Sequence, residues 1–164
     1  MNIEIVTVPC RSDNYAFLLR SNDRTALVDA PEARPILDAL EERGWELDEV
    51  WITHHHTDHV EGLQGLTKQF PSISVTGGAR DIHRLPPIHR EVDGGDSFQF
   101  AGHEVHVLDV SGHTVGHIAF HIPGISAAFT ADSLMALGCG RIFEGTPEMM
   151  WDSLSRIAAL PDET

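Results

Sequence analysis

The sequence predicts an α+β protein in which two β-sheets pack face to face with helices outside them, an αββα sandwich. The chain has 164 residues, which suits one domain with a substantial core. Its short strand-like segments fall into two groups, and helix-forming segments are interleaved with each group. This grouping favours two stacked sheets over a doubly wound parallel sheet.

The first group of strands opens the chain. Alternating and β-branched residues predict strands over residues 2–8, 15–19 and 25–29, joined by turns at 9–14 and 21–23 as in an antiparallel meander. A helix is predicted over residues 30–43, with Pro31 near its first turn and Gly44 as its stop. A strand over residues 50–53, a helix over 60–70 and a strand over 73–75 follow.

The second group begins after a segment of weak pattern. Residues 77–95 contain paired prolines and paired glycines, which predict a loop. Strands are then predicted over residues 98–100, 104–110, 118–122 and 126–130. A glycine-containing loop over residues 138–146 leads to a helix over 147–160, with Thr146 as its N-cap and Pro147 at its first position.

A dense set of potential metal ligands follows the strand at residues 50–53. His54 and His56 are two apart in extended backbone, so both point the same way. Asp58 and His59 stand at a helix start about 100° apart around the axis, and so aim at a different point. Imidazole and carboxylate are ligands that zinc and other transition ions favour, so the cluster predicts two metal ions. The alternative, a polar His-rich loop, does not explain the strand before it and the helix after it.

Two more candidates follow other predicted strands. His113 comes after the strand over residues 104–110, and Asp132 after the strand over 126–130. Three strands that each end in a potential ligand indicate a site along one edge of the sheet core. His117 and His121 lie nearby, but we expect each to be a buried, hydrogen-bonded histidine. We expect His55 to point away from the metals into structural contacts.

At this point the motifs resemble a known family. The pattern formed by His54, His56, Asp58 and His59 and then by His113 and Asp132 is similar to that of the metallo-β-lactamase superfamily. The segments over residues 53–59, 111–117 and 129–146 resemble, more specifically, the glyoxalase II (hydroxyacylglutathione hydrolase) family. The turn over residues 13–15 and the strand end over 27–29 also resemble it, so the match covers essentially the whole chain.

The resemblance implies a metal-dependent thioester hydrolase with two metal ions, usually zinc, with iron or manganese as alternatives. His54, His56 and His113 would hold the first ion, Asp58 and His59 the second, and Asp132 would bridge both. Asp58 and Asp132 would orient the hydroxide that the ions share. The implied reaction cleaves S-D-lactoylglutathione, an S-(2-hydroxyacyl)glutathione, to glutathione and D-lactate, which removes methylglyoxal.

The chain departs from the family in three places. Glu61 stands where the family usually has glycine and adds a negative charge near the site, while Phe143 stands where some members carry a substrate-contacting tyrosine. The family also continues past the position of Thr164 into a strand with a further metal-binding histidine and a basic helical region that contacts glutathione. We therefore expect the chain to be a single catalytic domain over residues 1–164, truncated at its C-terminus, with an incomplete second metal site.

Substrate contacts are expected in the loop over residues 138–146. Arg141 is the best candidate to attract the anionic glutathione conjugate, together with Phe143. The alternative is that Arg141 pairs with an acidic neighbour such as Glu144.

Composition excludes several other classes of function. The formal net charge of −14 argues against non-specific binding to nucleic acid or anionic membranes. The two cysteines make no disulfide framework, and neither a signal peptide nor a membrane-spanning apolar run is visible. We expect a cytoplasmic monomer whose partner is a small-molecule glutathione thioester. Two alternatives remain, a persulfide dioxygenase of the same fold with one iron, and an inactive metal-binding fragment.

Overall fold

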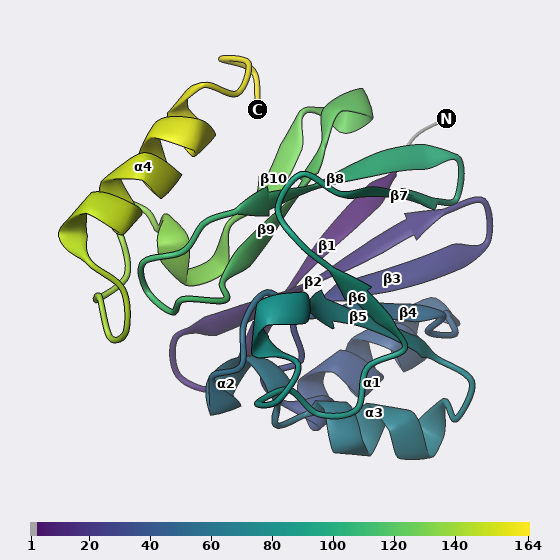
Figure 1. Ribbon diagram of the computed structural model, residues 1–164. Helices are drawn as coiled ribbons and strands as arrows, with labels where there is room; N and C mark the ends of the chain where they lie inside the picture. Colours follow the sequence, from purple (N-terminus) through teal and green to yellow (C-terminus); the bar gives the residue numbers. More distant parts are fainter. Residues whose placement is uncertain (1–2) are drawn as a thin grey trace.

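The computed structural model describes residues 3–164 and contains the two stacked β-sheets expected from the sequence (Figure 1). The first sheet has six strands in chain order, β1 to β6. Its first three strands pair antiparallel, and β3 to β6 pair parallel. These strands are β1 (Glu4–Cys10), β2 (Asn14–Ser21), β3 (Arg24–Val28), β4 (Glu49–Trp51), β5 (Ser74–Gly78) and β6 (Arg90–Val92).

The second sheet is antiparallel and has the order β10-β9-β8-β7. Its strands are β7 (Ser97–Phe100), β8 (His103–Asp109), β9 (Ile118–Ile122) and β10 (Ala127–Phe129). Short 3-10 turns lie between strands and at strand ends: η1 (Ala79–Asp81), η2 (Pro123–Ile125) and η3 (Ala131–Ser133).

Helices lie outside the two sheets. The helices α1 (Ala33–Arg43) and α3 (Leu63–Gln69) pack together on the outer face of the six-stranded sheet, and α2 (Thr57–Val60) precedes α3 (Figure 1). The helix α4 (Pro147–Ala158) lies beside the four-stranded sheet (Figure 1). It is anchored there because Ser153 Oγ donates to the Ser111 carbonyl at 2.6 Å.

Each face of the six-stranded sheet has its own apolar core. One core joins residues such as Leu18 and Val50 to Ile36 and Leu66 of the helices. The other joins the two sheets and centres on Trp51, whose ring meets those of Phe98 and Phe100 edge-on at 5.2 and 5.3 Å. Burial of large aromatic rings on both sides of the interface holds the sheets together.

Local signals placed several element ends correctly. Gly44 ends α1 in the left-handed region, at φ 63°, which glycine adopts without steric cost. Thr146 caps α4 by accepting a hydrogen bond from the Met149 backbone N–H, and Pro147 is the first helical residue. The strand over residues 118–122 has the predicted bounds. Cys10 and Cys139 are free thiols, as expected from their number.

Four predictions about elements were wrong. The first helix begins at Ala33, after Pro31, and the segment over residues 77–95 contains β6 in addition to loop. The helix predicted over residues 60–70 is instead two helices, α2 and α3, interrupted after Val60. The first strand runs two residues further than expected, to Cys10, and Asn2 of its predicted start lies outside the described residues.

The break between α2 and α3 has a tertiary cause. The backbone N–H of Gly62 donates to the Ala30 carbonyl at 2.8 Å, so it does not continue the ladder of α2. A Cβ at position 62 would lie 2.7 Å from the Ala33 nitrogen, and only glycine allows this approach. Within residues 3–164, no helix is both long and apolar enough to cross a membrane.

Candidate metal centre

The ends of four strands supply the candidate site. The segment after β4 carries the histidines over residues 54–59, and β3 ends immediately before Asp29. His113 follows β8, and Asp132 lies in η3 after β10. The two sheets are stacked so that these ends meet, and side chains from distant positions in the sequence contact one another there.

The first group of side chains consists of His54, His56 and His113. One ring nitrogen from each lies within 4.8 Å of the other two. His113 Nε2 is 2.9 Å from His56 Nδ1, and the ring centroids of His54 and His113 are 5.1 Å apart. His54 and His113 are buried, so the group faces the protein interior on one side.

The second group consists of His54, His59 and Asp132, whose ligand atoms also lie within 4.8 Å of one another. Asp132 reaches both groups. Its Oδ1 is 3.1 Å from His59 Nε2, and its Oδ2 is 3.2 Å from His113 Nε2. The sequence did not indicate that His54 would stand between the two groups.

Asp58 lies at the edge of this arrangement. Its Oδ2 is 3.8 Å from His59 Nε2, further than the Asp132 oxygen, and it completes neither of the two compact groups. Asn14 Nδ2 donates to this same oxygen at 3.0 Å and to the Asp58 carbonyl at 2.9 Å. Asp58 therefore lies beside the second group, which consists of His54, His59 and Asp132.

Hydrogen bonds fix the orientation of His54 and His113. His54 Nδ1 is 3.0 Å from Thr53 Oγ1, and His113 Nδ1 donates to the Arg141 carbonyl at 2.6 Å. Each imidazole thus turns its Nε2 atom toward the cluster, as metal-binding histidines do. His54 Nε2 is buried and has no hydrogen-bond partner among the described residues. A buried nitrogen without a partner is costly in a protein interior, and a metal ion would satisfy it.

Asp29 plays the same role for His59. Asp29 Oδ2 accepts a hydrogen bond from His59 Nδ1 at 2.8 Å and another from Thr53 Oγ1 at 2.8 Å, while its Oδ1 accepts from the Thr53 backbone N–H. Asp29 has φ 57°, a conformation that few residues adopt without a compensating contact. The position of Asp29 after a strand end was visible in the sequence, but its bonds to Thr53 and His59 were not.

Burial and charge set the protonation of these groups. Burial lowers the pKa of His54 well below its usual value, and the neighbouring histidines lower it further, so the ring is neutral and able to bind a metal. Burial raises the pKa of Asp132, but the hydrogen bond from His59 and the charges of nearby histidines outweigh it and lower the pKa. Burial lowers the pKa of His59, but Asp29 and Asp132 raise it to about 10. A cation bound at His59 would therefore replace a proton.

The loop over residues 138–146 covers the first group. Phe143 donates its backbone N–H to the His113 carbonyl at 3.1 Å, and its half-exposed ring lies 5.5 Å from the His56 ring and 5.2 Å from the His113 ring. The Arg141 guanidinium lies 5.2 Å above the Phe143 ring. Arg141 and Phe143 thus stand together beside the first group of ligands, and neither lines the cleft that opens beside the second group.

A charged network holds this loop in place. Asp81 is fully buried and binds both His55 Nδ1, at 3.0 Å, and the Arg84 guanidinium. Arg84 also pairs with Glu144, which accepts the Val115 backbone N–H at 2.9 Å. The alternative pairing of Arg141 with Glu144 is not what the structure contains, because Glu144 binds Arg84 instead. His55 makes the structural contacts expected of it.

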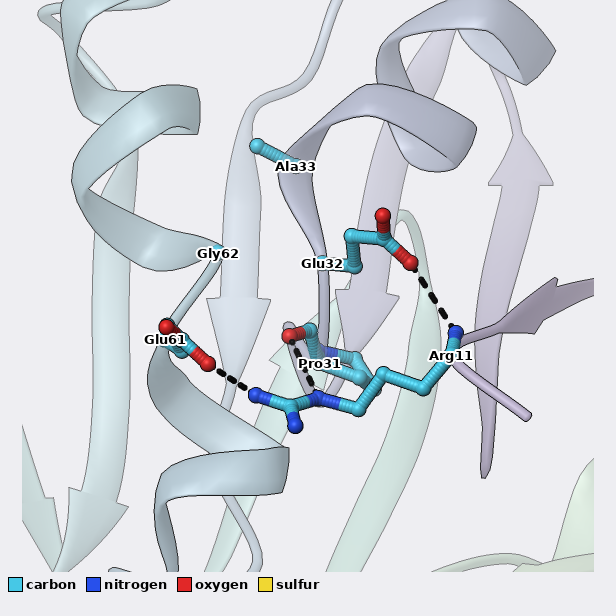
Figure 2. Close-up of a pocket in the computed structure, with 6 residues that line it drawn as sticks. All are labelled: Arg11, Pro31, Glu32, Ala33, Glu61 and Gly62. Carbon is cyan, nitrogen blue, oxygen red and sulfur yellow. Dashed lines mark hydrogen bonds and ion pairs between the residues drawn. The ribbon is translucent and has the colours of Figure 1, made fainter. Parts of the chain in front are cut away.

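The structure also defines the surroundings of three further side chains, Glu61, His117 and His121. Glu61 forms an ion pair with Arg11, so the guanidinium compensates the charge of its carboxylate (Figure 2). The pair lies beside a pocket that Pro31 and Gly62 also line. His117 is fully buried and stacks on His54 with ring centroids 4.4 Å apart. His121 is buried as expected, but its Nε2 has no hydrogen-bond partner within residues 3–164.

A cleft of about 730 Å³ opens beside the second group. Asp58, His59 and Asp132 contribute to its lining, together with apolar side chains such as Phe17 and Met135 and further polar ones. Its volume is typical of pockets that bind small organic ligands. The site therefore lies beside a cleft of mixed polar and apolar lining that is large enough for a small organic ligand.

Comparisons with known proteins agree with this geometry. The family model described as the metallo-beta-lactamase superfamily matches residues 11–164. A hydroxyacylglutathione hydrolase from Ruegeria pomeroyi is 63% identical over 166 residues, an alignment that covers 100% of this chain and 65% of that protein. The chain therefore spans slightly less than two thirds of the length of this curated relative.

Two solved structures share the fold. The B3 metallo-beta-lactamase BLEG-1 superposes with a TM-score of 0.88 at 18% identity, and the match covers 96% of this chain and 87% of that one. The structure of ETHE1 from Myxococcus xanthus superposes with a TM-score of 0.83 at 27% identity, covering 100% of this chain and 73% of that one.

Proposed function

The chain belongs to the metallo-β-lactamase superfamily, and from this premise we propose that it carries the metal-binding site of a hydroxyacylglutathione hydrolase. The proposed reaction is hydrolysis of an S-(2-hydroxyacyl)glutathione, such as S-D-lactoylglutathione, to glutathione and a 2-hydroxy acid such as D-lactate. This reaction would complete the removal of methylglyoxal. The 63% identity to a curated hydroxyacylglutathione hydrolase supports the proposal.

The position of Asp132 is the observation that carries the proposal furthest. Its two carboxylate oxygens lie 3.1 Å from His59 Nε2 and 3.2 Å from His113 Nε2, one oxygen to each group of ligands. A carboxylate placed in this way can bridge two cations. The superfamily fold with its histidine-rich groups implies a divalent metal, and we propose two Zn²⁺ ions, with iron or manganese as alternatives.

The residues present fit such a pair of ions. His54, His56 and His113 would hold the first ion, and His59, Asp132 and Asp58 would hold the second. The Nε2 atom of His54, which is buried and has no hydrogen-bond partner in the described part of the chain, supports this assignment. Two bound cations supply Lewis-acid polarisation of a thioester carbonyl and a water molecule of lowered pKa.

The chain's own side chains would position the substrate and the attacking water. Hydrogen bonds from Asn14 to Asp58 and from His59 to Asp132 outweigh burial and lower the pKa of both carboxyl groups, so both accept hydrogen bonds at neutral pH. These carboxylates would orient the water toward the carbonyl carbon. Arg141 would attract the anionic glutathione part of the substrate and so offset the repulsion from the net charge of −14. The Phe143 ring packs against the Arg141 guanidinium.

Thioester hydrolysis by the zinc-loaded chain tests the proposal directly. We expect loss of thioester absorbance with S-D-lactoylglutathione and two metal ions per chain by elemental analysis. Asp58→Ala and Asp132→Ala should nearly abolish turnover while circular dichroism stays unchanged. Asp152→Ala removes an exposed carboxylate on α4 and is the matched control, which should retain full activity.

Other outcomes would identify the alternatives. Oxygen consumption with glutathione persulfide and one iron per chain would indicate a persulfide dioxygenase instead. One ion or none, without turnover of either substrate, would indicate an inactive fragment. The monomeric state and the cytoplasmic location stay predictions, and gel filtration would test the first of them.

A further inference from the structure

We infer that Asn14 is a positioning residue, which holds the Asp58 carboxylate toward the second group of ligands. This inference rests on the two-ion site of the proposed function and adds a residue outside the ligand set. Asn14 is the first residue of β2 and lies opposite Cys10 in the β1–β2 hairpin. It is separated from Asp58 by 44 positions in the chain.

The broken helix gives Asn14 its partner. In a continuous helix, the Gly62 N–H would donate to the Asp58 carbonyl four residues earlier. Gly62 donates instead to the Ala30 carbonyl at 2.8 Å, and Asn14 Nδ2 takes its place at the Asp58 carbonyl, at 2.9 Å. A backbone group that the helix leaves unsatisfied is thereby paired by a side chain from another strand.

The same nitrogen also fixes the Asp58 side chain. Asn14 Nδ2 donates its other hydrogen to Asp58 Oδ2 at 3.0 Å. Both partners of the amide nitrogen are acceptors, so a flipped amide would set its oxygen against two oxygens, and the orientation is determined. Backbone and carboxylate of Asp58 are therefore held by one donor group, which leaves the side chain little rotational freedom.

Asp58 needs this restraint more than the other candidate ligands do. Its side chain is 42% exposed, compared with 7% for His59, and it stands on the four-residue helix α2. Its Oδ2 lies 3.8 Å from His59 Nε2, within reach of an ion bound there. A partly exposed carboxylate loses rotamer entropy when it binds an ion, and a preset orientation removes part of that cost.

The turn before Asn14 is fixed from two sides. Arg11, at φ 52°, donates its backbone N–H to Glu32 Oε2 at 2.9 Å and its Nε–H to the Pro31 carbonyl at 3.4 Å. Its guanidinium also pairs with Glu61, one residue after α2 (Figure 2). The turn is thus attached both to the segment before α1 and to the end of the helix that carries Asp58.

A purely structural role for Asn14 makes a different prediction. If Asn14 only completed the end of α2, its loss would disturb the whole helix, and His59 with it. Binding of both ions and the melting temperature would then fall together. A positioning role affects the second ion alone, since His54, His56 and His113 make no contact with Asn14 that the structure contains.

Metal titration of the whole chain separates the two roles. The variants are Asn14→Ala, which removes the donor, and Asn14→Asp, which replaces it by an acceptor of the same size. Asn22→Asp is the matched control, because Asn22 lies beyond the far end of β2 and donates to the Ala101 carbonyl at 2.8 Å. Both aspartate variants add one negative charge, so they differ in place and not in net charge.

The readouts are the Co²⁺ visible spectrum during titration and Zn²⁺ competition with a chelator. For Asn14→Ala and Asn14→Asp we expect the second ion to bind about 10- to 100-fold more weakly and the first ion to bind as in the unsubstituted chain. Asn22→Asp should bind both ions normally. Circular dichroism and melting curves identify a misfolded variant, and the second substitution at position 14 then decides the result.

Three results would overturn the inference: unchanged binding of both ions in Asn14→Ala, an equal loss of both ions, or uptake of a single ion by the unsubstituted chain. No substrate enters these titrations, so they are independent of the proposed reaction. A chain that binds two ions but hydrolyses no glutathione thioester would contradict the proposed function and leave the role of Asn14 intact.

Discussion

Arg84 and Glu144 lie 60 residues apart in the chain and form an ion pair beside the histidine-rich groups. Arg84 also binds the fully buried Asp81, and Glu144 also accepts the Val115 backbone N–H. The pair therefore ties the loop with Phe143 to the segment after β5 and to the loop with His113. Covalent structure alone does not fix these three segments relative to one another.

Breaking this pair should loosen the loop over residues 138–146 and leave the metal ligands in place. In Arg84→Met and Glu144→Gln we expect faster hydrogen exchange at the Val115 and Phe143 amides. KM for the thioester should rise about fivefold with little change in kcat, which corresponds to roughly 1 kcal/mol for a partly buried pair.

Arg34→Met is the control for this prediction, because it removes the exposed pair between Arg34 and Asp38 on α1, away from the site. It should change neither exchange nor KM. Equal effects of Arg34→Met and Arg84→Met would show that the loop does not depend on the pair with Glu144. A double variant, Arg84→Met with Glu144→Gln, should add little to either single one.

Gly116 has no room for a side chain. A Cβ at this position would lie 2.2 Å from Asp81 Oδ1, and Asp81 is buried and held by His55 and Arg84. We expect Gly116→Ala to destabilise the fold by about 1–3 kcal/mol through overpacking. The change would be measured as the free energy of unfolding in urea.

The chain offers a matched control at Gly138, where an added Cβ would meet no atom within 4 Å. Gly138→Ala should leave the free energy of unfolding within about 0.5 kcal/mol of its original value. An equally small change in Gly116→Ala would contradict the close packing of the loop with His113 against Asp81.

Asp109 should make stability depend on pH. Burial raises the pKa of its carboxyl group, but two hydrogen bonds from Ser111 and the charge of Arg80 outweigh burial and lower it below the usual value. A depressed pKa in the folded state means that the carboxylate stabilises the fold above the unfolded pKa of about 3.9. This contribution is lost as the pH falls through the folded pKa.

Asp109→Asn should therefore cost about 1–2 kcal/mol at pH 7, and the cost should shrink as the pH falls below about 4. Urea unfolding of both proteins across this range would measure the difference. A cost that stays constant down to pH 2 would mean that the charge on Asp109 contributes nothing.

Metal removal should destabilise the chain. The first group contains His54 Nε2, which is buried and has no hydrogen-bond partner among residues 3–164. A ligand that binds only the folded state stabilises it by about 4 kcal/mol when present at roughly 1,000 times its Kd. We expect a chelator to lower the melting temperature by about 10 °C. In His113→Ala the chelator should have a much smaller effect.

His83→Ala, in an exposed part of the loop after η1, is the control and should respond to the chelator as the original chain does. An identical chelator effect in His113→Ala would remove His113 from the ligand set.

Several elements could be predicted from the sequence because their causes are local. Gly44 and Thr146 act on the helix ends next to them, and the short, largely apolar run over residues 118–122 predicts a strand wherever it lies in the fold. The histidine cluster was visible for the same reason, since His54 and His56 are neighbours in the chain. His113 and Asp132 could then be assigned to the same site, because ligands that follow separate strands are expected along one edge of the sheet core.

Features that depend on distant contacts were not predictable. The helix expected over residues 60–70 breaks because Gly62 bonds to Ala30, and nothing near Gly62 in the sequence indicates this. The strand β6 exists because it pairs with β5, although its own sequence has a weak pattern. The ion-pair partner of Glu144 could not be predicted for the same reason. Glu144 pairs with the distant Arg84 and not with the nearby Arg141.

The sequence by itself determined which side chains can bind metal, most of the segments that form the two sheets, and how several elements begin and end. The family resemblance had implied that Asp132 bridges the two groups, and the structure supplied its distances to both. Only the tertiary structure decided that Asp29 bonds to His59 and that Asn14 bonds to Asp58. The physical reason is range: periodicity, capping and ligand chemistry act between neighbours in the chain. Contacts across 44 or 60 positions depend on how the two sheets stack and where the loops between them are anchored.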